Sequence, residues 1–109
     1  MTKNPKHKQL RSLEHLRFVR SQPCAIRGYY HICSGPMQSA HLRVGTDGGT
    51  GKKPSDNFTI PLCAKAHALQ HSIGEKSFEK RFGIDGLMIA GKLWIKSPAN
   101  KSGSRASGQ

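Results

Sequence analysis

Three histidines and an aspartate have the residue types and the spacing of a metal-dependent hydrolytic site. His67 and His71 are four residues apart, so in a helix they share one face with their Cβ atoms about 6 Å apart. Two imidazoles at this spacing can bind one divalent metal ion. His41 ends a predicted strand and Asp56 precedes the next one, which predicts a general base beside a metal-bound phosphate. The alternative is that His67 and His71 face solvent on a basic helix.

The cysteines could form a second, structural metal site. The chain has three, which are Cys24, Cys33 and Cys63. They could occupy three corners of a tetrahedral zinc site if a fourth ligand exists. The positions three residues after the first and third cysteine hold Arg27 and Ala66, so neither paired-ligand motif is complete, and His31 or the second cysteine would have to replace the missing ligands. The alternative is three buried thiols without a metal, and an odd number of cysteines argues against a disulfide framework.

The charge of the chain points to a polyanionic partner. There are 18 Lys and Arg residues against 6 Asp and Glu, a formal net charge of +12, and nucleic acid is the usual partner of such a surface. Arg43, Lys52 and Lys53 lie in or beside a glycine-rich loop, 45–56, and could grip a phosphate backbone without reading its sequence. The alternatives are general solubility, a ribosomal type of structural role, or a loop that only connects two strands.

The glycine-rich loop does not match the nucleotide-binding loops. A P-loop needs a glycine at the position of Thr46 and a Ser or Thr at that of Lys53. Pro54 stands where the last glycine of a dinucleotide-binding fingerprint would follow Gly49 and Gly51. The sequence therefore excludes both of these ways of binding a nucleotide.

Helices and strands that could position these residues follow from apolar periodicity and from capping residues. Ser12 could cap a first helix that reaches about Ser21. We expect an apolar stripe on that helix to face the core, made of Leu10, Leu13, Leu16 and Val19. Residues 24–38 are predicted to be irregular. Two short strands, 39–44 and 58–62, flank the glycine-rich loop, and the histidine helix begins where the second strand ends.

Two further helices are predicted after the histidine helix. The first spans 75–82 and is stopped by Gly83, and the second is capped by Asp85. The last helix carries the apolar residues Leu87, Met88, Leu93 and Trp94, among others. Helices together with two short strands predict an α+β fold class.

The length of 109 residues predicts one domain, spanning 10–96. Residues 1–9 and 97–109 are polar and basic, and we expect them to be disordered tails. The sequence has neither the apolar run of a signal peptide nor a membrane-spanning stretch, so we expect a soluble, cytoplasmic protein with no membrane partner.

Several linked motifs resemble one nuclease family. They are His15-Leu16-x-Phe18-Val19-Arg20-Ser21-x-Pro23-Cys24, Ala40-His41-Leu42-Arg43, Gly51-x-Lys53-Pro54-Ser55-Asp56, Pro61-Leu62-Cys63 followed by His67 and Gln70-His71, and Phe82-Gly83-Ile84-Asp85. The chain resembles the small phage- and prophage-associated HNH-like nucleases related to the RecA-dependent recombination-enhancing nuclease. The resemblance implies a ββα-metal fold with a catalytic divalent ion such as Mg²⁺, often buttressed by a structural zinc. It also implies single- or double-stranded DNA as substrate, in phage recombination or DNA processing, and a RecA-type recombinase filament as candidate partner.

The resemblance also implies roles for individual residues. His41 would activate water, and His67 and His71 would bind the catalytic ion. Asp56 would either bind the metal or orient a catalytic group. A competing interpretation is a non-catalytic zinc- or DNA-binding accessory module that keeps the fold without the activity.

The family's structural zinc site is only partly present. Cys24 and Cys63 match zinc ligands of the family, whereas Arg27 and Ala66 stand where the family often has further ligands. Glu79 is a third departure, at a position where an aromatic residue is commoner. A zinc site in this chain would therefore need replacement ligands.

Overall fold

The computed structural model describes residues 9–29, 33–49 and 51–100. Their fold is α+β, with four α-helices, one short 3₁₀ helix and a two-stranded sheet among the described residues. In chain order the elements are α1 (Leu13–Arg20), η1 (Arg27–Tyr29), β1 (Met37–His41), β2 (Thr59–Cys63), α2 (Ala64–Ile73), α3 (Glu75–Phe82) and α4 (Gly86–Lys96). Within these segments, every helix is too short or too polar to span a lipid bilayer.

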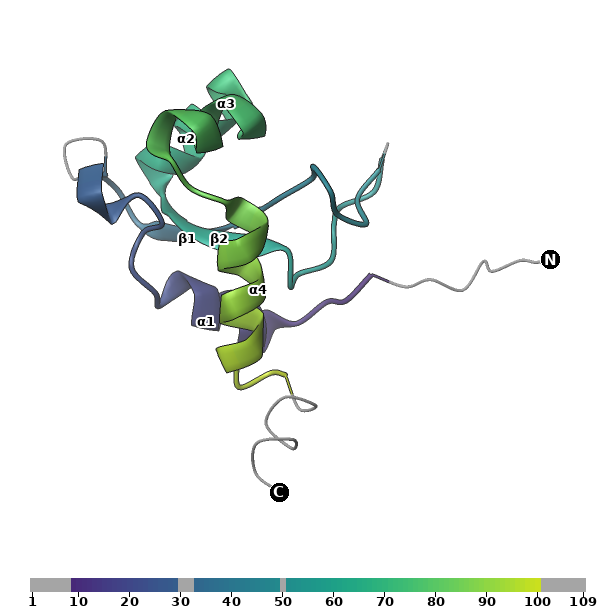
Figure 1. The fold of residues 1–109 in the computed structure, drawn as a ribbon. Helices are drawn as coiled ribbons and strands as arrows, with labels where there is room; N and C mark the ends of the chain where they lie inside the picture. Colours follow the sequence, from purple (N-terminus) through teal and green to yellow (C-terminus); the bar gives the residue numbers. More distant parts are fainter. Residues whose placement is uncertain (1–8, 30–32, 50, 101–109) are drawn as a thin grey trace.

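The two strands form the centre of the fold. They pair antiparallel, with Met37 opposite Cys63 and His41 opposite Thr59. Figure 1 shows α2 and α3 above the strands, α1 and α4 below them, and the connection between β1 and β2 extending to the right. The predicted order of strand, loop, strand and helix is confirmed, although β1 lies two to three residues earlier than we expected.

Local capping signals set the helix boundaries. The Ser12 hydroxyl accepts a hydrogen bond from the His15 amide at the start of α1, and the Asp85 carboxylate does the same for Met88 at the start of α4. Gly83 ends α3 in the left-handed conformation, with a φ of 63°. These three predictions are confirmed. The segment predicted to be irregular does contain an element, because Arg27–Tyr29 forms η1.

The buried face of α1 differs in part from our prediction, and α4 buries mainly small residues. Leu13 is 66% exposed, whereas Val19 is buried as predicted, and α1 also buries His15. On α4, Leu87 and Met88 are exposed, while Gly86 and Ala90 are buried. The remaining core joins the sheet to α2, α3 and α4, and its central members are Ala40, Leu42, Ile60, Leu62, Ala66, Phe78 and Ala90.

Ser97, the residue at which we expected the C-terminal tail to begin, is buried. Its hydroxyl forms a 2.7 Å hydrogen bond with Nδ1 of the fully buried His15. The ring of Trp94 packs edge-on against the same imidazole, with 4.9 Å between centroids. His15 therefore joins α1 to the end of α4.

We expect the buried His15 to make the fold sensitive to acid. Burial lowers the pKa of His15, and the charge of Asp56 offsets this only in part. The unfolded chain therefore takes up a proton more readily, so the stability is present above the unfolded pKa of about 6.5 and is lost as the pH falls through it. In urea unfolding between pH 7.5 and 5, the free energy of unfolding should fall less steeply with pH for His15→Gln than for the wild type. If the free energy of unfolding falls equally steeply in both proteins, His15 is not the acid-sensitive group.

Candidate functional site

A histidine–aspartate pair lies where β1 ends. His41 is the last residue of β1, and its Nε2 donates to Oδ1 of Asp56 over 2.8 Å. Asp56 belongs to the connection that leads into β2, and the Thr59 hydroxyl donates to its backbone carbonyl. The antiparallel register places His41 opposite Thr59, which brings the aspartate, three residues earlier, to the histidine ring.

The Asp56 carboxylate is buried and fully engaged with donors. Its Oδ2 accepts from the Ser12 amide at 2.7 Å, and its Oδ1 lies 3.3 Å from the Arg11 guanidinium. Burial alone would raise the pKa of Asp56, but the hydrogen bond from His41, the Ser12 amide and the charge of Arg11 together lower it. This arrangement favours an ionised carboxylate that orients His41 over one that binds a metal. It leaves Nδ1 of His41 as the nitrogen that can accept a proton.

The two helix histidines face each other on α2, as their spacing predicts. Their Nε2 atoms lie 3.1 Å apart and their ring centroids 4.8 Å apart. Two nitrogens that bind one ion at about 2.0–2.1 Å each are about 2.9–3.4 Å apart for angles between octahedral and tetrahedral. The separation of His67 and His71 therefore fits a shared divalent ion.

The environment of His67 suits a neutral ligand. Burial lowers the pKa of His67, and the nearby His71 and His41 lower it further. A metal binds the neutral imidazole, so a lowered pKa reduces competition from protons. Among the described residues, no third histidine, cysteine or carboxylate completes a three-ligand group with this pair.

A basic cleft joins the two pairs of residues. One pocket of about 240 Å³ is lined by Ser39, His41, Arg43, Lys53, Pro54, His67 and His71. A second pocket of about 180 Å³ shares three of these residues and adds Gln70, Gly74 and Glu75. The positive charge at the cleft suits a phosphate group. Lys52 is exposed and lines neither pocket, although it pairs with Gly49 at the tip of the same loop.

Two residues that were not predicted from the sequence to be functional, Arg11 and Glu75, stabilise the backbone around this cleft. Arg11 donates to the carbonyls of Lys53 and Pro54, and so ties the segment before α1 to the loop. The Glu75 carboxylate accepts from the backbone amides of Arg43 and Val44. No sequence signal marks these contacts, because their partners lie more than 30 positions away.

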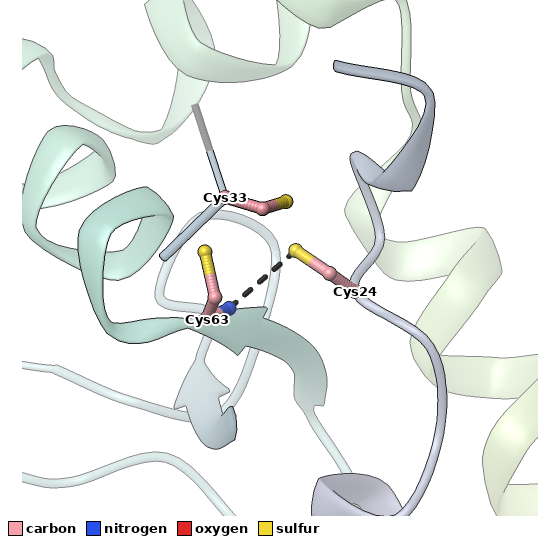
Figure 2. A group of neighbouring side chains, drawn as sticks. All are labelled: Cys24, Cys33 and Cys63. Atoms are coloured by element: carbon pink, nitrogen blue, oxygen red, sulfur yellow. Dashed lines mark hydrogen bonds between the residues drawn. The ribbon is translucent and has the colours of Figure 1, made fainter. Parts of the chain in front are cut away.

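The three cysteines converge from separate parts of the chain. Cys24 follows α1, Cys33 precedes β1, and Cys63 ends β2, and Figure 2 shows their sulfur atoms pointing toward one another. The sulfurs all lie within 4.8 Å of one another. This convergence confirms that the three thiols could bind a metal ion such as zinc.

The backbone around Cys63 stabilises a thiolate. Its Sγ accepts hydrogen bonds from the amides of Ser34 and Ala66, the second of which caps α2. Burial would raise the pKa of Cys63, but these two amides, together with hydrogen bonds from Cys33 and Cys24, outweigh burial and lower it. Burial and hydrogen bonds with the other two thiols raise the pKa of Cys33 to about 12. Cys63 therefore ionises before Cys33, and a metal would have to displace the proton of Cys33.

The fourth position of the thiol cluster is not filled by a described residue. No further histidine, cysteine or carboxylate joins the three sulfurs among the described residues. Arg27 is exposed at the start of η1, and Ala66 is fully buried in the core. His31, our predicted replacement, lies outside the described residues.

Comparison with known proteins places the chain among proteins without an assigned activity. A family model described as "Protein of unknown function (DUF968)" matches residues 1–96. The "Uncharacterized protein YdfU" of Escherichia coli (strain K12) is 34% identical over 82 residues, which are 74% of this chain and 22% of that protein. The chain thus spans less than a quarter of the length of this relative. No solved structure matches the chain.

Proposed function

Since the chain belongs to the DUF968 family, whose description names no activity, we propose a function from the site itself: a metal-dependent DNA endonuclease. The observation that carries the proposal is one basic pocket that holds His41, with its Asp56 partner, opposite His67 and His71. A proton acceptor, a pair of metal ligands and cationic side chains are the groups that hydrolysis of a phosphodiester requires. Their order along two strands and a helix supports a ββα-metal, HNH-like site.

In the proposed reaction, His41 acts as the general base. Asp56 holds the imidazole through Nε2, so that Nδ1 takes a proton from the water that attacks phosphorus. The ionised Asp56 then stabilises the imidazolium that forms, as a buried carboxylate does in other histidine–aspartate pairs. Arg43 and Lys53 bind the phosphate backbone, because both line the same pocket.

His67 and His71 would hold the divalent ion. When bound there, Mg²⁺ or another divalent ion would neutralise charge on the phosphate and on the leaving oxygen. Two imidazoles are better ligands for a transition metal such as Mn²⁺ or Zn²⁺ than for Mg²⁺, which prefers oxygen ligands. We therefore expect Mn²⁺ to support cleavage at lower concentrations than Mg²⁺.

The cysteine cluster would hold a structural zinc. Three thiols within 4.8 Å and two amides aimed at Cys63 support this assignment. Because Cys63 also caps the helix that carries His67 and His71, zinc bound there would brace the catalytic helix. His31 is our candidate for the fourth ligand.

DNA cleavage itself is the test of this function. Supercoiled plasmid and single-stranded DNA should be nicked in the presence of Mg²⁺, Mn²⁺ or Zn²⁺, with or without a RecA-type recombinase filament as partner. A chelator should stop the reaction. If none of these conditions gives cleavage, the enzyme proposal fails and a non-catalytic DNA-binding accessory module takes its place.

We expect DNA binding to weaken steeply with salt. Each phosphate that the protein neutralises on duplex DNA contributes about −0.9 to the slope of log K against log salt concentration. Lys53→Gln should therefore reduce the magnitude of the slope by about one. Lys96→Gln, at the last residue of α4 and outside both pockets, is the matched control and should leave it unchanged. Fluorescence anisotropy at several salt concentrations measures both, and a wild-type affinity independent of salt would contradict the electrostatic interface.

A further inference from the structure

A glutamine of β1 makes a direct contact with one of the two helix histidines. The Oε1 atom of Gln38 lies 2.7 Å from Nδ1 of His67. We propose that Gln38 is a positioning residue that fixes the tautomer and the ring orientation of His67, so that its Nε2 lone pair is set for a metal ion before the ion arrives. This inference rests on the proposed metal site. No motif in the sequence indicates a role for Gln38.

The direction of this hydrogen bond determines the tautomer. An amide oxygen can only accept, so Nδ1 of His67 must carry the hydrogen atom. A neutral imidazole has one N–H group, so its Nε2 is then an acceptor. The 3.1 Å contact between the two Nε2 atoms is consequently a hydrogen bond that His71 donates. His67 is thus ready to bind an ion, whereas His71 must first release its Nε2 hydrogen.

The position of Gln38 in the fold makes it a firm support for this bond. Gln38 pairs with Leu62 within the two-stranded ladder, one residue from its end, and the fully buried Ala40 lies two residues further along β1. Both Gln38 and His67 are half-buried, so water competes weakly for their hydrogen bond. Without the acceptor, the imidazole can place its hydrogen on Nε2, where it would block the metal-binding atom.

Three substitutions separate this role from general packing. Gln38→Leu removes the acceptor at similar volume, Gln38→Asn keeps the amide but shortens its reach, and Gln38→Glu keeps an acceptor at the same distance. Gln22→Leu is the matched control, because within the described part of the chain the Gln22 side-chain amide donates to Phe18 and Ser21 at the end of α1 and to no metal-site residue.

The experiment reads the tautomer and the metal affinity separately, on the full chain. Long-range ¹H–¹⁵N NMR spectra of the histidine rings report which nitrogen of His67 carries the hydrogen. A Mn²⁺ titration followed by EPR gives the affinity, and broadening of the ring signals of His67 and His71 locates the ion. In Gln38→Leu and Gln38→Asn we expect the hydrogen to move to Nε2 and the Kd for Mn²⁺ to rise about 10–100-fold. For Gln38→Glu and Gln22→Leu, the Kd for Mn²⁺ should stay within about threefold of the wild-type value, which is below the rise of about 10–100-fold expected for the other two variants.

Other outcomes would overturn the proposal. One is an unchanged tautomer or a wild-type Mn²⁺ affinity in whichever of Gln38→Leu and Gln38→Asn is folded. The other is a wild-type protein in which Mn²⁺ does not broaden the His67 signals. Because Gln38→Asn stays polar, it provides the test if Gln38→Leu does not fold. If the wild-type protein binds Mn²⁺ at His67 but never cleaves DNA, the proposed nuclease activity is rejected, whereas the proposed role of Gln38 is retained.

Discussion

His41→Ala is expected to slow DNA cleavage by roughly 10²–10⁴-fold, the usual contribution of a general base. DNA binding and metal binding should stay nearly intact, because a general base acts in the transition state and adds little to ground-state affinity. Asp56 supports this role by holding the imidazole over 2.8 Å. Single-turnover nicking of supercoiled plasmid measures the rate, and anisotropy with labelled DNA measures the affinity.

His71→Ala is the variant to compare with it. His71 is a proposed metal ligand, so its loss should weaken metal binding, and excess Mn²⁺ should restore part of the activity by mass action. The same excess should do nothing for His41→Ala. If His41→Ala cleaves DNA as fast as the wild type, the proton acceptor is another group and the assignment of His41 is wrong.

Cys63→Ser is expected to abolish zinc binding and to destabilise the fold. Zinc that binds only the folded state adds about 4 kcal/mol when its free concentration is a thousand times Kd, and a small domain loses this contribution with its ligand. The hydroxyl of serine can still cap α2, since serine is a preferred N-cap residue. The substitution therefore removes the metal ligand while it keeps the helix boundary.

Zinc content and urea unfolding together measure this effect. Native mass spectrometry should find one zinc ion per wild-type chain and none in Cys63→Ser. Chelation should lower the wild-type midpoint toward that of the variant and should leave the variant unchanged. A wild-type protein that is folded, contains no zinc and is insensitive to chelators would show that Cys24, Cys33 and Cys63 are simply buried thiols.

The element boundaries could be predicted because their causes are local. A side chain within three residues of a helix start caps it, as Ser12 and Asp85 do. A glycine that adopts the left-handed conformation ends α3 at Gly83. The face that each helix buries could not be predicted in the same way. Leu13 is exposed and His15 is buried, because Trp94 and Ser97, about 80 positions away, pack on the polar residue.

The sequence by itself determined which groups could do chemistry. The four-residue spacing of His67 and His71 sets their common face in any helix, and the charge of +12 belongs to the composition. Tertiary structure decided how these groups act together. The pairing of β1 with β2 brings Asp56 to His41, and packing of α2 on the sheet brings Gln38 to His67. The folding of separate segments gathers three thiols from residues 24 to 63. Contacts between distant residues depend on strand register and helix packing, which no local pattern specifies.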